Sequence, residues 1–162
     1  MIIHLNLGSN LGNRLGNINR AIAFLIESDK IVKGSIRVSQ PFESDAWGYV
    51  TEHRYINVGL SMTLNAEMKP RELIEWLQDI QERVNRKNPH RDKDGYYIDR
   101  LLDIDVIAIG EKTIDVEELV VPHPRMHLRE FVLCPMAELE PGWIHPVFKK
   151  NIFELLEDLH KI

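Results

Sequence analysis

The strongest constraint on the fold is a segment of ten residues, 55–64, in which apolar and polar side chains alternate. Ile56 and every second residue after it are apolar, whereas Tyr55, Asn57 and the positions in step with them are mostly polar or small. Successive side chains of a β-strand point to opposite faces of its sheet. The segment therefore predicts a strand with one buried and one solvent-exposed face, as in many antiparallel sheets.

Similar patterns predict further strands and helices on both sides of this segment. In chain order, the predicted elements are a strand (1–7), a helix (13–28), a strand (32–40), the strand 55–64, a helix (70–84) and a strand (101–109). Lys69, which precedes Pro70, is not a convincing N-cap for the second helix. The β-α-β-β-α-β order predicts an α+β protein with a ferredoxin-like fold, in which two helices back a half-solvated antiparallel sheet.

Outside this core the sequence predicts a long loop and a C-terminal extension. Residues 41–53 are mixed and polar, which is typical of a loop. Asn151 and Glu154, three residues apart, resemble a capping box that opens a final helix. We therefore expect a single domain over residues 1–162, with a core at 1–110 and an extension at 111–162.

The composition narrows the class of protein. The 162 residues are 44% hydrophobic and 28% charged, which is ordinary for a globular domain, and the net charge of −5 disfavours binding to nucleic acid or anionic membranes. No apolar run approaches the roughly 18 residues that cross a bilayer, and the N-terminus lacks the pattern of a signal peptide. Cys134 is the only cysteine, which excludes an intramolecular disulfide and fits a reducing compartment. We expect a cytoplasmic monomer that binds neither nucleic acid nor membranes.

Two aspartates interrupt the last apolar strand. Asp103 and Asp105 are two residues apart, so on a strand they point to the same face with backbones about 6.6–6.8 Å apart. Carboxylates placed this way repel each other and lose hydration unless cations compensate. Mg²⁺ is usually held by one or two carboxylates and substrate phosphates, and such a pair could hold two metal ions for phosphoryl transfer. Alternatively, the aspartates face water or pair with nearby arginines, and the residues alone leave both interpretations open.

A basic segment directly precedes these aspartates in an otherwise acidic chain. Its cations are Arg83, Arg86, Lys87, Arg91, Lys93 and Arg100. The guanidinium fork matches phosphate oxygens, so the segment suits a polyphosphate, although charged loops are more often simply solvated. The sequence has neither a P-loop nor a G-x-G-x-x-G motif. A nucleotide would therefore be held by side chains and metal ions.

Tyr55 and Asn57 share the polar face of the central strand. A tyrosine ring can stack on a heterocycle, and an amide can donate and accept hydrogen bonds at its edge. One alternative is an ordinary exposed strand face. Another is an RNA-binding module, because the predicted element order also occurs in RNA-recognition domains. The net charge and the lack of an aromatic, glycine-rich strand signature argue against RNA.

His123 and His127 are four residues apart, a spacing that on a helix could ligate zinc. Pro124 disfavours a helix at this point, and the sequence offers no glutamate or thiol pattern to complete such a site. We therefore expect no structural zinc. Cys134 follows three apolar residues, so we expect it to be buried by packing rather than reactive.

Several segments together resemble one known family. They are Leu7-Gly8-Ser9-Asn10-Leu11-Gly12, Phe42 to Gly48 with Trp47, Tyr55-Ile56-Asn57, Arg100-Leu101-Leu102-Asp103-Ile104-Asp105, Val121-Pro122-His123 and Arg129-Glu130-Phe131. In this combination the chain resembles the 6-hydroxymethyl-7,8-dihydropterin pyrophosphokinases (2-amino-4-hydroxy-6-hydroxymethyldihydropteridine diphosphokinases) over nearly its whole length. The resemblance implies a ferredoxin-like fold and transfer of pyrophosphate from ATP to the pterin hydroxymethyl group, with release of AMP, in folate biosynthesis.

The resemblance also implies roles for individual residues. Asp103 and Asp105 correspond to the ligands of two Mg²⁺ ions, and the catalytic residues correspond to Arg86, Arg100 and His123. The ATP-binding residues correspond to Gln78, Arg86, Arg100, His123 and Arg129, and the pterin-binding residues to Ser44, Trp47, Tyr55, Asn57 and Phe131. The segment between Arg86 and Arg100 is longer than in better-known members and lacks their tryptophan. An inactive relative that keeps only the pterin pocket is a third interpretation.

Overall fold

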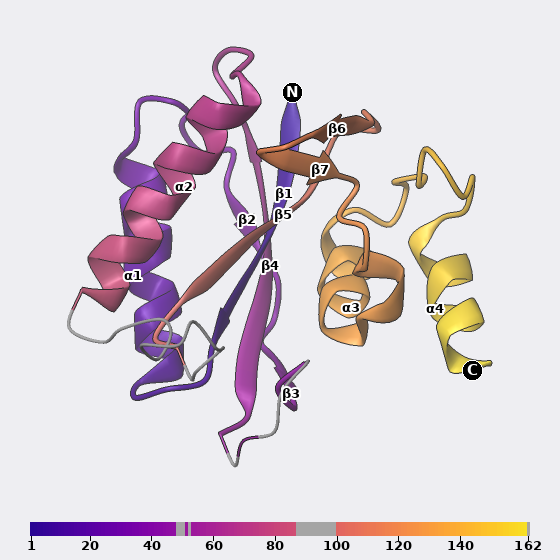
Figure 1. Ribbon diagram of the computed structural model, residues 1–162, viewed down its shortest axis with the longest axis horizontal. Helices are drawn as coiled ribbons and strands as arrows, with labels where there is room; N and C mark the ends of the chain where they lie inside the picture. Colours follow the sequence, from indigo (N-terminus) through magenta and orange to yellow (C-terminus); the bar gives the residue numbers. More distant parts are fainter. Residues whose placement is uncertain (48–50, 52, 87–99, 162) are drawn as a thin grey trace.

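The computed structural model describes residues 1–47, 51, 53–86 and 100–161, and its centre is an antiparallel sheet (Figure 1). The sheet is made of β1 (Ile2–Ser9), β2 (Arg37–Val38), β3 (Phe42–Ser44), β4 (Tyr55–Thr63) and β5 (Asp103–Ile109). Their order is β2-β4-β1-β5, with β3 also paired to β4, and every pair is antiparallel. β1 and β4 are therefore central strands, and β5 lies at an edge of the sheet.

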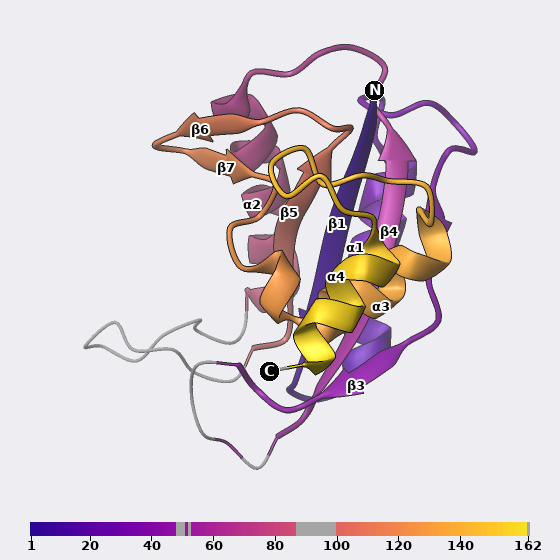
Figure 2. The same cartoon turned by 90° about the vertical axis from the view of Figure 1, so that its right-hand side faces the viewer.

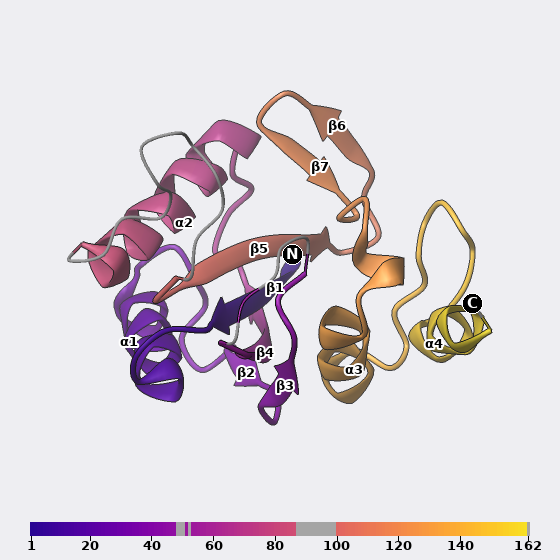
Figure 3. The ribbon, with the colours of Figure 1, turned by 60° about the horizontal axis from the view of Figure 1, so that its bottom comes forward.

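Two pairs of helices lie on opposite faces of this sheet (Figure 3). α1 (Arg14–Glu27) and α2 (Pro70–Asn85) cover one face, whereas α3 (Glu130–Leu139) lies on the other face and α4 (Ile152–His160) packs against α3, both in front of the sheet in Figure 2. The buried apolar side chains form two clusters, one that includes Leu5, Leu25 and Leu77 and one that includes Ile107, Leu133 and Leu155. None of the helices in the described part of the chain is long and apolar enough to cross a membrane.

The predicted elements with a clear apolar period are confirmed. α1 and α2 begin and end within one residue of the predicted bounds, and β4 and β5 occupy the two predicted strands. Lys69 makes no side-chain capping bond to α2, as expected. At α4, Asn151 Oδ1 accepts a hydrogen bond from the Glu154 amide at 2.9 Å, and Glu154 Oε1 accepts one from the Asn151 amide at 3.0 Å. The predicted capping box is therefore present.

The structure corrects the sequence analysis at several shorter elements. The predicted strand at 32–40 is only two residues long, and the predicted loop at 41–53 contains β3. The elements that the sequence analysis missed are β6 (Ile114–Val116), β7 (Leu119–Val121), the 3₁₀ turn η1 (Met126–Leu128) and α3. Strands of three residues are too short to show a period, and α3 carries Pro135 in its interior, which disfavours a helix on sequence grounds.

The expectation of a half-solvated sheet is also wrong for its centre. In β1, every residue from Ile3 to Ser9 is buried, because α3 covers the face that the α1–α2 layer leaves open. This helix approaches the sheet closely at Gly59. A Cβ atom on that glycine would lie 2.8 Å from Cβ of Pro135, so the close packing of α3 on β4 depends on the absence of a side chain.

His4 is a buried polar residue on the strand that α3 covers. Its side chain is 3% exposed, and Nδ1 has no hydrogen-bond partner among the described residues. Burial and, to a lesser extent, the charge of Arg37 lower the pKa of His4 from 6.5 to about 4. The unfolded chain therefore binds a proton near pH 6.5 that the folded protein does not accept until the pH is near 4.

Replacing His4 by phenylalanine is expected to make folding stability less dependent on pH. In the wild-type protein, acidification from pH 6.5 to pH 4 favours the unfolded state through His4 by about 3 kcal/mol, and phenylalanine removes this contribution. Urea unfolding across this pH range measures the slope for both proteins. The exposed His53→Phe variant serves as the control for replacing a histidine by phenylalanine elsewhere in the chain. An unchanged slope in His4→Phe would contradict the argument.

Candidate active site

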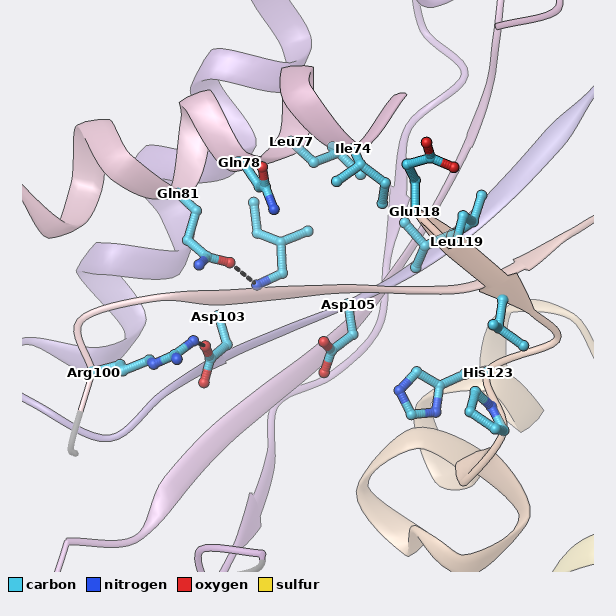
Figure 4. A pocket seen from close by; sticks show the side chains of 14 residues that line it. Ile74, Leu77, Gln78, Gln81, Arg100, Asp103, Asp105, Glu118, Leu119 and His123 are labelled. Carbon is cyan, nitrogen blue, oxygen red and sulfur yellow. Dashed lines mark hydrogen bonds and ion pairs between the residues drawn. The ribbon is translucent and has the colours of Figure 1, made fainter. Parts of the chain in front are cut away.

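Asp103 and Asp105 lie at the start of β5, where the strand runs along the edge of the sheet. Asp103 is paired with Gly8 and Asp105 with Asn6 of β1, so both carboxylates project from one face, as Figure 4 shows. They line a cavity of about 350 Å³. Other residues that line it are Gln78, Gln81, Arg100 and His123. The structure thus brings five of the predicted site residues together around one cavity.

Both aspartates also have an arginine close by. Arg100 forms an ion pair with Asp103, and Arg129 Nη1 lies 3.9 Å from Asp105 Oδ2. The hydroxyl of Tyr55 donates a hydrogen bond to Asp103 Oδ2 at 3.3 Å. The pairing with arginines that the sequence offered as one alternative is therefore observed, and the carboxylates also line a cavity, as a metal site would require.

The positive charges of the arginines do not fully offset the cost of burying the two carboxylates. Burial raises the pKa of Asp103 above its usual value, the charge of Arg100 opposes this effect, and the charge of Asp105 adds to it. Burial likewise raises the pKa of Asp105, against the charges of Arg129 and Arg100. The loss of hydration is thus larger than the attraction of the guanidinium groups. A pair of carboxylates in this condition fits a hard divalent cation, which would add the missing positive charge.

The oxygen donors of this cavity fit a Mg²⁺ ion that is shared with a substrate better than a metal ion that is held by protein ligands alone. Among the residues that the structure describes, no group of three or more His, Cys, Asp or Glu side chains converges on one point. Two carboxylates leave most of a Mg²⁺ coordination shell to water and phosphate oxygens, which is how this ion is usually bound in phosphoryl-transfer sites. His127 instead packs edge-on against Phe148, with ring centroids 4.9 Å apart.

His123 faces the same cavity from the segment after β7. Its amide donates to the carbonyl of Ile107 at 2.8 Å, and its Nδ1 accepts from the amide of Arg125 at 3.1 Å. Burial, then the charges of Arg129 and Arg125, lower the pKa of His123 to about 4. At neutral pH the imidazole is therefore uncharged. Because Nδ1 accepts a hydrogen bond, the proton resides on Nε2, which can donate to an anion.

Arg129 connects the aspartates to two aromatic residues of the predicted pterin site. Its guanidinium carbon lies 4.4 Å from the ring centroid of Trp47 and 5.6 Å from that of Phe131. Arg125 lies over Trp47 as well, at 5.4 Å. Such cation–π contacts orient the planar guanidinium groups. The loop that carries Trp47 is thereby attached to the start of α3.

Ser44, Tyr55 and Asn57 form a second group next to Asp103. Asn57 Nδ2 donates to Ser44 Oγ at 2.8 Å, and the Asn57 side chain is almost fully buried. Gly8 of β1 lies between this group and Asp103, and a Cβ atom there would lie 3.0 Å from Asn57 Oδ1 and 3.2 Å from the Tyr55 ring. The absence of a side chain at Gly8 keeps this part of the face open beside the tyrosine ring.

Arg86 is the predicted site residue that the structure places elsewhere. It is exposed at the C-terminal end of α2 and lines a separate cavity with Arg20, Phe24 and Arg83. The segment that follows, with Arg91, lies outside the described residues. Cys134 is only partly buried, so the expectation that packing buries it holds only in part, and this partial burial raises the pKa of its thiol. A raised pKa disfavours the reactive thiolate.

Two asparagines support the site and were missed in the sequence analysis. Asn10 Oδ1 accepts from the amide of Arg100 at 2.7 Å, and the Asn10 amide donates to the Arg100 carbonyl at 3.1 Å. Asn6 Nδ2 donates to the carbonyl of Phe131 at 2.9 Å. In an α-helix that carbonyl would accept from residue 135, but Pro135 has no N–H to donate. The position of Asn6 within an otherwise apolar strand was the pattern that could have indicated its buried hydrogen bond.

Comparison with known proteins identifies related sequences and structures. A family model described as 7,8-dihydro-6-hydroxymethylpterin-pyrophosphokinase matches residues 4–141. Proteins named 2-amino-4-hydroxy-6-hydroxymethyldihydropteridine pyrophosphokinase are 34% identical in Aquifex aeolicus, over 94% of this chain and 88% of the relative, and 32% identical in Bacillus subtilis, over 85% and 77%. A solved Plasmodium falciparum HPPK-DHPS structure superposes with a TM-score of 0.67 at 14% identity, covering 97% of this chain. The chain spans only 42% of that longer protein.

Proposed function

Since this chain belongs to the 7,8-dihydro-6-hydroxymethylpterin pyrophosphokinase family, we propose that the cavity beside β5 is where its reaction takes place. The enzyme transfers the pyrophosphoryl group of ATP to the hydroxymethyl group of the dihydropterin in folate biosynthesis. Attack by the pterin oxygen at the β-phosphorus leaves AMP. The observation that carries the assignment of the cavity is the pair Asp103 and Asp105, side by side next to Arg100 and His123.

Asp103 and Asp105 would hold Mg²⁺, and two ions is the number we propose. When bound, the metal neutralises phosphate charge and makes the pterin hydroxyl a better nucleophile. The geometry supports this role because the two carboxylates share one face, line the cavity and are incompletely compensated by arginines. Such a site requires no protein nucleophile, since positioning and charge stabilisation dominate the barrier to phosphoryl transfer.

The remaining residues divide between the two substrates. Arg100 and Arg129 can exchange their contacts with the aspartates for contacts with phosphate oxygens, to which the guanidinium fork binds well. His123 can donate its Nε2 proton to a phosphate oxygen without itself being charged. Gln78 lines the same cavity from α2 and can contact the nucleotide. Arg86 is assigned to ATP on the family resemblance alone.

The pterin is assigned to the region around Tyr55, which borders Asp103. Tyr55 and Phe131 would stack on the ring, with Asn57, Ser44 and the backbone at Trp47 at its edge. Support comes from the hydrogen bond between Tyr55 and Asp103, which brings the stacking residue next to the metal site. It also comes from the open surface at Gly8. The hydroxymethyl group would then point toward the two carboxylates.

We also propose that residues 1–162 form one ferredoxin-like domain. The strand order β2-β4-β1-β5, with α1 and α2 on one face, supports this description. The C-terminal segment contributes His123 and Arg129 to the proposed site, so it would be an integral part of the domain. A monomer is proposed because one chain supplies every residue assigned to the site. The single cysteine supports the cytoplasm as its location.

The direct test is the identity of the nucleotide product. Incubation with ATP, MgCl₂ and 6-hydroxymethyl-7,8-dihydropterin is expected to yield AMP in equal amount to the pterin diphosphate. Omitting the pterin or adding EDTA should abolish AMP formation. Formation of ADP would reject pyrophosphoryl transfer. Binding of pterin without any turnover would instead support an inactive relative.

A further inference from the structure

β5 is an edge strand, and its outward backbone groups are not paired with another strand in the described part of the chain. Unpaired N–H and C=O groups on an edge are costly when buried, and they allow the strand to bulge or slip. This matters here because the first residues of β5 carry Asp103 and Asp105. Groups that bond to the outer N–H and C=O groups of β5 can therefore fix the position of the two carboxylates.

Side-chain amides from α2 take the place of a neighbouring strand. Asn85 pairs with Leu102 in both directions: its Nδ2 donates to the Leu102 carbonyl at 2.8 Å, and its Oδ1 accepts from the Leu102 amide at 3.1 Å. One helical turn earlier, Gln81 Oε1 accepts from the amide of Ile104 at 2.8 Å, as drawn in Figure 4. The two amides thus pair with Leu102 and Ile104, the residues just before and between the aspartates.

The Asn85 side chain is also bonded to the backbone of α2 at Gln81. Asn85 Nδ2 donates to the carbonyl of Gln81 at 2.9 Å, and the Asn85 side chain is buried. Further along the same edge, the amide of His123 donates to the carbonyl of Ile107 at 2.8 Å. The outer edge of β5 is therefore paired by α2 just before and between the carboxylates, and by the His123 segment after them.

The inner edge alone does not fix the strand along its whole length. Asp103 to Val106 pair regularly with β1, but the register shifts between His4 and Leu5, opposite the following part of β5. A slip of one residue would turn every side chain of a strand to the opposite face. The outer contacts at Leu102 and Ile104 therefore add to the pairing with β1 at the end of the strand that carries both carboxylates.

We propose that Gln81 and Asn85 are positioning residues that hold the Asp103–Asp105 pair in place by completing the outer edge of β5. The inference rests on the proposed function of the cavity as a site for nucleotide and Mg²⁺. Neither residue needs to touch the substrate for this role. Their effect on the reaction passes through the backbone of Leu102 and Ile104 to the carboxylates.

The test compares Gln81→Met with the wild-type protein, because methionine keeps the length of the side chain and removes the acceptor for Ile104. Amide hydrogen exchange of Ile104 is expected to become at least about tenfold faster. Binding of Mn²⁺ with the non-hydrolysable analogue α,β-methylene-ATP, measured by electron paramagnetic resonance, is expected to weaken by about 10- to 100-fold. Glu75→Met, on an exposed position of α2, is the matched control and should change neither quantity.

Two further variants separate positioning from simple loss of folding. Gln81→Glu retains an oxygen acceptor and should restore protection of the Ile104 amide. Asn85→Leu should weaken Mn²⁺–nucleotide binding in the fraction that thermal melting shows to be folded. If Gln81→Met exposes the Ile104 amide but binds Mn²⁺–nucleotide like wild type, the positioning role is wrong. If the wild-type protein itself binds no Mn²⁺–nucleotide, the proposed function fails instead.

Discussion

Replacing Asp105 by asparagine is expected to reduce kcat/KM for AMP formation by about 10²- to 10³-fold. Asparagine has the same shape but lacks the negative charge that a divalent cation requires. The same change should not unfold the protein, because burial of the Asp105 carboxylate outweighs its attraction to Arg129 and Arg100. A neutral side chain at this position removes that desolvation cost. We therefore expect activity to fall while the free energy of unfolding stays equal or increases.

The measurement combines initial rates of AMP formation with urea unfolding of the same preparations. Asp103→Asn should have the same effect in the rate assay, although it also replaces one of the two oxygens that accept from Tyr55 and Arg100. Asp115→Asn, on an exposed position of β6, is the control and should retain wild-type rates. A variant of Asp105 that is stable and fully active would exclude the carboxylate pair as the metal site.

Arg100→Met is expected to reduce kcat by about 10²-fold or more, with a smaller effect on KM. The Arg100 side chain is 14% exposed, and hydrogen bonds to Asn10 hold its backbone at both the amide and the carbonyl. A guanidinium positioned in this way can stabilise charge that develops on the transferred phosphates. Methionine keeps most of the apolar stem but removes the cation.

Arg100→Lys separates charge from geometry. Lysine keeps the positive charge without the planar fork, so we expect it to recover only part of the lost rate. Arg83→Met is the matched control, because Arg83 is half exposed on α2 and pairs with Asp79 at 3.0 Å. Equal reductions of kcat/KM in Arg83→Met and Arg100→Met would show that general loss of positive charge, rather than the position of Arg100, is responsible.

The local patterns predicted the elements whose side chains follow a regular period. The alternation at 55–64 and the apolar segment around Asp103 are local patterns of side chains that predict strands. The structure has β4 and β5 at these two positions. The common face of Asp103 and Asp105 follows from the geometry of any strand. α3 was not predicted because its residues are largely apolar and because Pro135 disfavours a helix. The carbonyl of Phe131, which lacks an N–H partner at Pro135, accepts a hydrogen bond from Asn6, far away in the sequence.

The candidate site was predictable only in part from the residues themselves. Spacing predicted the carboxylate pair, and the resemblance to a known family supplied the partners around it. No local pattern indicates that Arg129 lies next to Asp105, or that Asn10 holds Arg100. These contacts join residues that are between 24 and 90 positions apart, and side-chain spacing carries no information over that range.

The sequence by itself determined that Asp103 and Asp105 share one face of an apolar strand, because successive residues of a strand point in opposite directions. Only the tertiary structure decided which side chains surround that face and how far their positive charges balance the two carboxylates. The folded chain brings Arg100 and His123 to the cavity and places Arg129 beside Asp105. Burial and charge at the carboxylates depend on those neighbours, so their chemistry is a property of the folded chain.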